Sequence, residues 1–262
     1  MKTDFLKSAR GFLFDLDGVF FVGSTPIPGG AEAIRFLKER NIPCRFTTNT
    51  TTRSQATLYA EIRAMRMPIE ASEIFSAPQA AVRFLRTKGS CSCHFLLNDD
   101  TRRDFAEFTV NDRNPDYVVI GDIGERWNYP LLNSVFQMLM SGAEMLALHK
   151  GRYWQMPDGL KMDIGAFIAG LEFVSGKTAA VVGKPSKEFF HYALADMGVS
   201  PSEAVMIGDD LISDVGGAQN AGVKGVLVRT GKFREELVAR SAIQPDLIID
   251  SIADLPKYLQ FI

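Results

Sequence analysis

The chain has 262 residues, of which 46% are hydrophobic and 23% are charged, and its formal net charge at pH 7 is −2. This length allows one large or two modest domains, and the near-neutral charge gives no signature of a nucleic-acid or membrane partner. We find no charged-then-apolar leader and no apolar stretch near the ~20 residues that span a bilayer. The odd count of 3 cysteines, without framework spacing, favours a reducing compartment. We therefore expect a cytoplasmic protein.

The first strong signal is the run Gly11-Phe-Leu-Phe-Asp-Leu-Asp-Gly-Val19. Its apolar residues predict a buried strand, which ends in a turn that carries Asp15 and Asp17. Alternation along a strand puts residues i and i+2 on one face, so the two carboxylates would repel unless a cation or proton lies between them. The pair suggests a magnesium site, because Mg²⁺ takes carboxylate and phosphate oxygens together. The alternative is an ordinary strand end followed by an Asp-Gly turn.

A second polar strand end follows in Cys44-Arg-Phe-Thr-Thr-Asn-Thr-Thr-Thr-Arg53, directly before a helical pattern from Ser54 to Met65. Hydroxyl and backbone donors at a junction of strand and helix are typical of a phosphate site. The alternative, that these residues are only helix caps, fits one of the hydroxyls and not all of them. The segment therefore indicates phosphate binding.

A long insertion follows, with its own alternation of strands and helices, and it ends before another polar strand end at Lys184. This lysine lies between a glycine and a proline in Ala179-Ala-Val-Val-Gly-Lys-Pro-Ser-Lys187, so its ammonium could neutralise both acids and phosphate. The alternative is a surface lysine. The expected insertion elements are strand 94–97, helix 101–107, strand 117–120, helix 129–141, strand 145–148, hairpin 152–157 and helix 163–175.

The last polar strand end is Ala204-Val-Met-Ile-Gly-Asp-Asp-Leu-Ile-Ser-Asp214. Asp209, Asp210 and Asp214 follow an apolar strand, and carboxyl ends of parallel strands meet at one edge of a sheet. Asp210 and Asp214 could instead be acids favoured by a helix N-terminus. The expected core elements are strands 11–16, 44–48, 180–183, 204–208, 225–229 and 246–249, and helices 29–40, 53–66, 76–88, 186–198, 211–221 and 253–261.

Taken in order, Asp15-x-Asp17, Thr48-Asn49, Lys184-Pro185 and Gly208-Asp209-Asp210 with Asp214 resemble the four motifs of the haloacid dehalogenase-like hydrolase superfamily. The resemblance covers essentially the whole chain. One departure is Thr47, where an aliphatic residue often precedes the Thr-Asn pair; we assign the motif hydroxyl to Thr48, with Thr47 as the alternative. The strings that resemble the branch with a type IIA cap, NagD-like and 4-nitrophenylphosphatase-like, are Pro28-Gly-Gly-Ala31, Phe46-Thr-Thr-Asn-Thr-Thr51, Ala147-Leu-His-Lys150, Val181-Val-Gly-Lys-Pro185 and Ala218-Gln-Asn-Ala-Gly222.

The resemblance implies an α/β fold with a Rossmann-like parallel-sheet core, helices on both faces and an inserted smaller α/β cap domain. We expect residues 1–89 and 177–262 to form the catalytic core and 90–176 to form the cap. It further implies a homodimer through the cap, which the apolar face of the predicted helix 129–141 also favours; that face could instead only cover the cap sheet.

The same resemblance implies a Mg²⁺-dependent phosphatase with an aspartyl-phosphate intermediate. Asp15 would be the nucleophile and Asp17 the general acid and base. The metal ligands would be Asp15, the Asp17 backbone carbonyl and Asp209, with Asp214 or Asp210 in support. Thr48, Asn49 and Lys184 would bind the phosphate oxygens.

Substrate choice is left to the cap, where Lys150-Gly-Arg-Tyr-Trp-Gln-Met-Pro-Asp-Gly-Leu160 mixes aromatic, cationic and flexible residues. Arg152 and Trp154 are the candidate substrate contacts, and a surface hairpin with Trp154 packed on the cap is the alternative. The expected partner is a small phosphorylated metabolite, a phosphoamino acid or pyrophosphate. A phosphomutase on the same fold and a weakly catalytic regulatory phosphate-binding protein remain alternatives.

Overall fold

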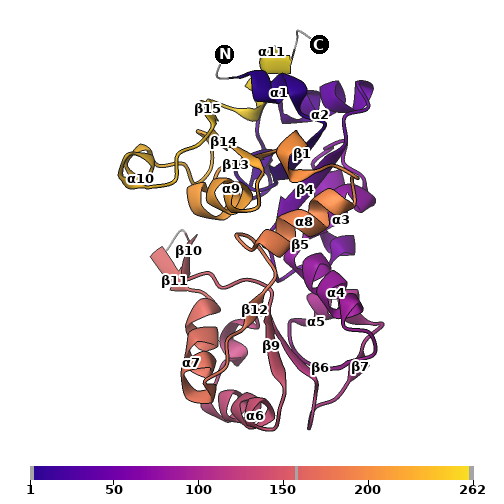
Figure 1. The fold of residues 1–262 in the computed structure, drawn as a ribbon, viewed down its shortest axis with the longest axis vertical. Helices are drawn as coiled ribbons and strands as arrows, with labels where there is room; N and C mark the ends of the chain where they lie inside the picture. Colours follow the sequence, from indigo (N-terminus) through magenta and orange to yellow (C-terminus); the bar gives the residue numbers. More distant parts are fainter. Residues whose placement is uncertain (1–2, 157–158, 260–262) are drawn as a thin grey trace. The chain divides into compact units, whose positions relative to one another are not determined.

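The computed structural model describes residues 3–156 and 159–259, with only the backbone described for 154–156 (Figure 1). The chain folds into two compact units, and each is described separately below. Unit 1 comprises Met1–Thr48, Leu58–Phe75 and Lys184–Ile262, and unit 2 comprises Asn49–Thr57 and Ser76–Gly183.

Unit 1 is built on a six-stranded sheet. All pairings between β1 and its two neighbours, and onward to β14 and β15, are parallel. Its connections are the helical crossovers that parallel strands require. In spatial order the strands are β15 (Leu247–Ile249), β14 (Lys224–Val228), β13 (Ala204–Gly208), β1 (Gly11–Asp15), β4 (Cys44–Thr48) and β5 (Ile74–Ser76).

Helices cover both faces of this sheet (Figure 1). Alternate residues of β1, such as Phe12 and Phe14, pack with one set of helices, while Leu227 of β14 packs with the other. The helical segments are α1 (Asp4–Ser8), α2 (Gly30–Glu39), α3 (Gln55–Ala64), α8 (Lys187–Ala195), a π-helical turn (Leu211–Gly216), α9 (Gly217–Asn220), α10 (Glu235–Arg240) and α11 (Leu255–Leu259). The first three residues of α3 are grouped with unit 2. A two-stranded hairpin, β2 (Phe21–Val22) and β3 (Thr25–Pro26), follows β1.

Unit 2 has its own five-stranded sheet, and its pairings are all parallel. The strands in spatial order are β12 (Ala180–Val181), β9 (Glu144–Ala147), β8 (Tyr117–Ile120), β6 (Ser92–Leu96) and β7 (Thr109–Val110). The helices are α4 (Ala77–Thr87), α5 (Asp99–Arg102), α6 (Tyr129–Met140) and α7 (Gly165–Ser175), and an antiparallel hairpin joins β10 (Tyr153–Met156) to β11 (Gly159–Met162).

Together the two sheets confirm the predicted Rossmann-like α/β class with a second, smaller α/β unit. One strand prediction was wrong: residues 180–183 were expected in the core sheet, but β12 pairs with β9 of unit 2. An apolar run shows that a strand is buried without showing which sheet it joins. Unit 2 also differs from the expected 90–176, since it includes 49–57, 76–89 and 177–183.

Aromatic packing holds the centre of unit 1. Phe14 is fully buried, and its ring centroid lies 5.6 Å from that of Phe46 and 5.4 Å from that of Phe20. We expect Phe14→Ala to lower the free energy of unfolding by about 3–5 kcal/mol, because a large cavity remains. Urea unfolding measures the loss, with Leu237→Ala on an exposed helix as the control. A Phe14→Ala protein as stable as the control would contradict this packing model.

Candidate active site

Three acidic side chains from unit 1 meet at the carboxyl edge of its sheet. Asp15 is the last residue of β1, and Asp209 follows directly after β13, the parallel neighbour of β1. Asp214 reaches the same place from the π-helical turn. One carboxylate oxygen from each of the three lies within 4.8 Å of the other two, and all three residues are buried. We call Asp15, Asp209 and Asp214 the acidic cluster.

Lys184 is the cation of this cluster. Its side chain is 3% exposed, and its Nζ donates to Asp15 Oδ1 at 2.5 Å and to Asp214 Oδ1 at 2.7 Å. Burial alone would lower the pKa of Lys184, but the two adjacent carboxylates outweigh it, so the pKa lies above its ordinary value. The ammonium is therefore charged at neutral pH.

One ammonium cannot neutralise three buried carboxylates. Burial, followed by the charges of Asp15 and Asp214, raises the pKa of Asp209 to about 8. Burial also raises the pKa of Asp214 to about 7, and the attraction of Lys184 opposes this shift without cancelling it. The site carries an excess of negative charge, which a proton or a cation would relieve.

Two loops pack closely against the carboxylate of Asp209. Gly18 and Gly231 both have positive φ, and a Cβ at either would lie about 2 Å from Asp209 Oδ2, at 1.9 and 2.0 Å. The Lys232 N–H donates to that same oxygen at 2.7 Å. Asp209 Oδ1 is buried and has no hydrogen-bond partner among the described residues. A buried carboxylate oxygen without a donor is expected where a metal ion is the missing partner.

The residues of the acidic cluster therefore fit a small hard cation. Carboxylate oxygens are the ligands that Mg²⁺ uses, and the excess negative charge supplies the electrostatic attraction. Lys184 occupies Asp15 Oδ1 and Asp214 Oδ1, while the Asp210 N–H donates to Asp214 Oδ2 at 3.1 Å. Asp214 thus has both oxygens engaged, which suits a supporting carboxylate better than a direct ligand.

The sequence left two choices open, between Asp210 and Asp214 as the supporting carboxylate and between Thr47 and Thr48 as the motif hydroxyl, and hydrogen bonds bear on both. Asp210 Oδ1 accepts the N–H groups of Ile212 and Ser213 at 3.0 and 2.9 Å, so this side chain caps the π-helical turn. The Thr47 hydroxyl donates to the Phe14 carbonyl at 2.9 Å inside the sheet and is fully buried. Thr47 therefore has a structural partner, and Thr48 is the better candidate for the motif hydroxyl.

Asp17 occupies a different environment from the acidic cluster. Its residue is exposed, and its Oδ1 accepts the Gly23 N–H at 3.1 Å beside the β2–β3 hairpin. Asp17 is therefore in contact with solvent, whereas the acidic cluster is buried. This setting suits a group that exchanges protons with water better than one held permanently in a buried ion pair.

The sequence interpretation missed one loop of the site, Thr230–Lys232. It follows β14, and besides the Lys232 N–H bond to Asp209, the Thr230 hydroxyl donates to the Gly18 carbonyl. The ammonium of Lys232 also lies 3.7 Å from Asp210 Oδ2. The signal was available, because Thr230-Gly231-Lys232 follows a predicted strand that ends at the same edge of the sheet.

The remaining candidate residues belong to unit 2. Asn49 is the first residue after β4, and Arg152 is exposed beside β10. The backbone of Trp154 lies in β10, but its side chain falls outside the described residues. Their substrate contacts therefore remain predictions.

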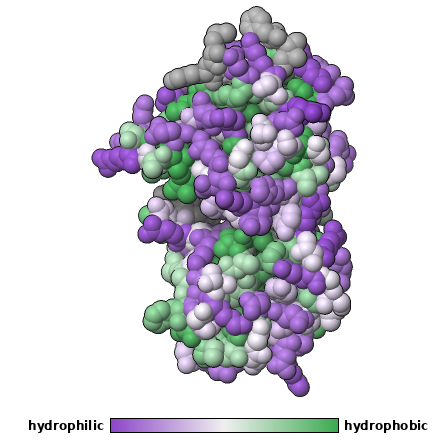
Figure 2. All heavy atoms as spheres, in the orientation of Figure 1, coloured by the Kyte–Doolittle hydropathy of each residue, from purple (hydrophilic) through white to green (hydrophobic). Residues whose placement is uncertain are grey.

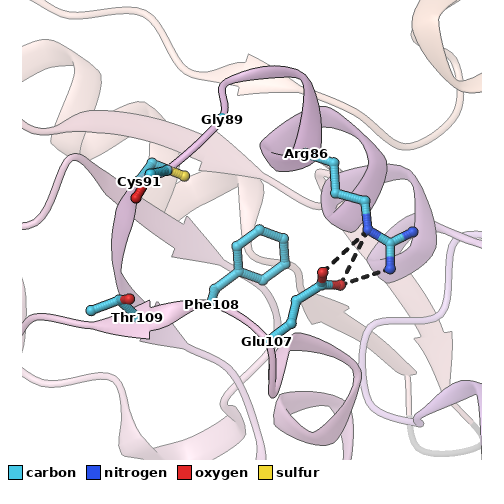
Figure 3. Close-up of a pocket in the computed structure, with 7 residues that line it drawn as sticks. Arg86, Gly89, Cys91, Glu107, Phe108 and Thr109 are labelled. Carbon is cyan, nitrogen blue, oxygen red and sulfur yellow. Dashed lines mark hydrogen bonds and ion pairs between the residues drawn. The ribbon is translucent and has the colours of Figure 1, made fainter.

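Unit 2 also contains a pocket of about 290 Å³ between the end of α4 and β7 (Figure 3). Arg86 and Glu107 point toward one another at its rim, with Arg86 Nη2 2.7 Å from Glu107 Oε1. The guanidinium is thus already paired, and the pocket lacks the buried charge that marks the acidic cluster. Its lining residues are Arg86, Gly89, Ser90, Cys91, Glu107, Phe108 and Thr109.

Comparison with known sequences gives two family-model matches. Residues 12–111 match the family described as haloacid dehalogenase-like hydrolase, and residues 181–255 match a HAD-hydrolase-like family. The chain is 38% identical to phospholysine phosphohistidine inorganic pyrophosphate phosphatase of Danio rerio, over 96% of this chain and 94% of that protein. It is 40% identical to haloacid dehalogenase-like hydrolase domain-containing protein 2 of Bos taurus, over 87% of each.

Solved structures of two phosphatases are similar to this chain over nearly its full length. The 4-nitrophenylphosphatase of Thermotoga maritima superposes with a TM-score of 0.91 at 26% identity, covering 98% of this chain and 99% of that one. The p-nitrophenyl phosphatase of Archaeoglobus fulgidus superposes with a TM-score of 0.89 at 27% identity, covering 95% and 98%. Among the described residues, no helix combines the length and apolar character needed to cross a bilayer.

The excess charge of the acidic cluster predicts how Asp209→Asn will behave. The pKa of Asp209 is about 8 in the folded chain and about 3.9 when unfolded, so the folded state binds more protons between those values. Without metal, wild-type stability should therefore fall as pH rises through this window. Asp209→Asn should flatten that fall and be more stable at pH 8 by at least about 1 kcal/mol, or about 2–4 °C.

Thermal denaturation in chelator from pH 5 to 9, followed by Mg²⁺ titration, measures both effects. Mg²⁺ should raise the melting temperature of the wild type and hardly affect Asp209→Asn. Asp250→Asn, at an 85% exposed side chain, is the matched control and should follow the wild type. A variant less stable than wild type at pH 8 in chelator, with an unchanged Mg²⁺ response, would refute the site.

Proposed function

The chain belongs to the haloacid dehalogenase-like hydrolases, and on this basis we propose that it is a magnesium-dependent phosphatase. It hydrolyses small phosphate monoesters through an aspartyl-phosphate intermediate on Asp15. The observation that carries the proposal is the buried contact of Lys184 Nζ with Asp15 Oδ1 at 2.5 Å, beside two further carboxylates. This arrangement fixes one carboxylate at a strand end, next to positive charge that a phosphate also needs.

Asp15 acts as the nucleophile in this proposal. Lys184 holds one of its oxygens, and we assign the attack on phosphorus to the other. The attack forms an acyl phosphate and breaks the bond to the leaving oxygen, and water then hydrolyses the acyl phosphate to free phosphate. The fixed ammonium orients the carboxylate before reaction, so little reorganisation is needed.

Magnesium would be held by the Asp15 carboxylate, the Asp17 backbone carbonyl and Asp209, with Asp214 in support. When bound, it supplies the positive charge that offsets repulsion between Asp15 and a phosphate dianion. Lys184 remains necessary beside it, because the acidic cluster has three carboxylates.

Asp17 serves as the general acid and base. Its exposed carboxylate can give a proton to the leaving oxygen and then take one from the hydrolytic water. The Gly23 N–H bond to Oδ1 orients the group. Thr48, Asn49 and Lys184 would bind the phosphate oxygens that gain charge.

Substrate choice is assigned to unit 2, with Arg152 and Trp154 as the candidate contacts. The name of the Danio rerio relative includes phospholysine, phosphohistidine and pyrophosphate, so phosphoamides and pyrophosphate belong in the test panel beside sugar phosphates and nucleotide monophosphates. Phosphate release from 4-nitrophenyl phosphate with and without Mg²⁺ tests the basic activity. A phosphomutase would return an isomerised phosphate ester and little free phosphate, and a regulatory binding protein would release none.

A homodimer through unit 2 is the proposed assembly. Val135 and Leu139 of α6 are buried in the core of unit 2, so part of the predicted apolar face covers the sheet. Apolar side chains nevertheless remain at the surface over α6 and α7, where Tyr129 is 79% and Phe173 is 89% exposed (Figure 2). Helix α6 has no charged residue, so α6 can meet its copy in a second chain without like-charge repulsion.

We expect light scattering at micromolar concentration to give the mass of a dimer. Phe173→Glu should produce a monomer, because a charge buried at the interface without a partner is strongly unfavourable. Val110→Glu, at a 52% exposed position on β7, is the control and should stay dimeric. A monomeric wild type would disprove the dimer.

The two aspartates of the first motif should behave differently toward an activated aryl phosphate. Asp15→Asn cannot form the acyl phosphate, so we expect no burst and essentially no turnover. Asp17→Asn keeps the nucleophile, and an activated leaving group needs no acid, so this variant should be phosphorylated but hydrolyse slowly for want of a base. Intact-mass spectrometry after a rapid quench should find one added phosphoryl group on Asp17→Asn and none on Asp15→Asn.

The two variants serve as each other's control, since both replace a carboxylate by an amide of similar volume. An adduct on Asp15→Asn, or equal steady-state activity of the two, would mean that the roles are wrongly assigned or that water attacks phosphorus directly.

A further inference from the structure

We propose that Asn98–Asp104 of unit 2 is a clamp that positions the segment Asn49–Thr57 for phosphate binding, with Asp100 and Thr101 as its principal positioning residues. We call Asn98–Asp104 the loop clamp. This inference rests on the proposed phosphatase function, in which Asn49 binds phosphate, and extends it to residues with a supporting role.

The loop clamp donates hydrogen bonds to two consecutive carbonyl groups of the segment. The Thr101 hydroxyl donates to the Thr51 carbonyl at 2.8 Å, and Thr101 is fully buried. The Asn98 side-chain amide donates to the Thr52 carbonyl, also at 2.8 Å. These bonds fix the backbone of the segment just after Asn49, where no helix or strand would otherwise hold it.

The loop clamp also supplies acceptors for the start of α3. Asp100 Oδ2 accepts the Ser54 N–H at 2.8 Å, and Asp100 Oδ1 accepts the hydroxyls of Ser54 at 3.2 Å and Thr57 at 3.0 Å. Asp104 Oδ2 accepts the Gln55 N–H at 3.0 Å. The first N–H groups of a helix lack partners within the helix, and negative charge there is favoured by the helix dipole.

The charge state of Asp100 supports this role. The Ser54 N–H bond is the largest of several that lower the pKa of Asp100 below its ordinary value, so it is ionised at neutral pH. An ionised carboxylate would repel a phosphate dianion rather than bind it. Asp100 therefore acts on the segment and not on the substrate.

The contacts of the loop clamp give Thr51, in the threonine run that follows Asn49, a structural role. Thr51 is 3% exposed, its hydroxyl accepts the Asp122 N–H at 3.2 Å, and its carbonyl is held by Thr101. Thr51 is thus an anchor of the segment and not part of a phosphate cradle. The threonines 47 and 51 both serve structure, which leaves Thr48 and Asn49 as the motif pair.

Asn49, at the other end of the segment, packs closely against Gly183. A Cβ added at Gly183 would lie 2.8 Å from Asn49 Oδ1 and 2.2 Å from the Leu148 carbonyl oxygen. In this proposal the loop clamp holds the backbone that carries the Asn49 amide. If the segment loosens, the fraction of molecules with a competent site falls, and apparent affinity for phosphate falls by the same factor.

The test compares variants that loosen the loop clamp with a control that loses a similar bond elsewhere in unit 2. Thr101→Val removes the hydroxyl donor at nearly constant volume, Thr101→Ser restores it, and Asp100→Asn removes the charge and one acceptor. Asp116→Asn is the matched control, because Asp116 Oδ2 accepts the Ser92 N–H at 2.7 Å and the Ser92 hydroxyl at 2.8 Å.

We expect Thr101→Val and Asp100→Asn to raise KM for 4-nitrophenyl phosphate about tenfold, equivalent to about 1.4 kcal/mol, with kcat changed less than about threefold. The inhibition constant of inorganic phosphate should rise by the same factor. Thr101→Ser should return both values to within about twofold of wild type, and Asp116→Asn should leave both unchanged even if it lowers the melting temperature.

Wild-type KM and phosphate inhibition in Thr101→Val and Asp100→Asn would overturn the proposal, as would an equal rise in Asp116→Asn. If Asp100→Asn does not fold, the Thr101→Val and Thr101→Ser pair decides alone. A wild type that releases no phosphate would instead refute the proposed function. Calorimetric binding of inorganic phosphate to the same variants then tests the loop clamp without turnover.

Discussion

A single buried ammonium among three buried carboxylates is the constraint on which the site depends. Lys184 lies 169 residues from Asp15 and 30 from Asp214 in sequence, yet its Nζ contacts both. Removing each of these ions from water costs several kcal/mol, so the contacts must be well formed to offset it. Three separate segments of unit 1, β1, the π-helical turn and the segment that begins at Lys184, therefore have to meet with little freedom.

The same arrangement leaves the site short of positive charge. The raised pKa values of Asp209 and Asp214 both follow from burial together with neighbouring carboxylates. Such a cluster opposes folding when no cation is present, and a packed apolar site would be more stable. Gly18 and Gly231 leave space for this carboxylate, and its Oδ1 has no hydrogen-bond partner in the part of the chain that the structure describes. The surrounding loops therefore accommodate the charge of Asp209 rather than neutralise it.

Aspartate has three different roles in this chain, and the local environment decides among them. Asp209 is buried among like charges, Asp100 and Asp210 accept N–H groups at helix starts, and Asp17 is exposed beside a hairpin. Burial opposes ionisation, N–H donors favour it, and water keeps the group accessible to proton transfer. The same type of side chain, aspartate, therefore serves the proposed chemistry in unit 1 and holds a loop in unit 2.

The sequence by itself indicated the α/β class, the strand ends and the acids at 15 and 209, because apolar runs, breaks and charges are local properties. It left Asp210 and Asp214 as alternatives for the supporting carboxylate. Only the tertiary structure decided that 180–181 pairs in unit 2, that Asp210 caps a helix, and that Thr230–Lys232 and the loop clamp join the arrangement. Each of these depends on which distant segment supplies a partner, and hydrogen-bond partners 23 or 46 residues apart leave no periodic pattern in the sequence.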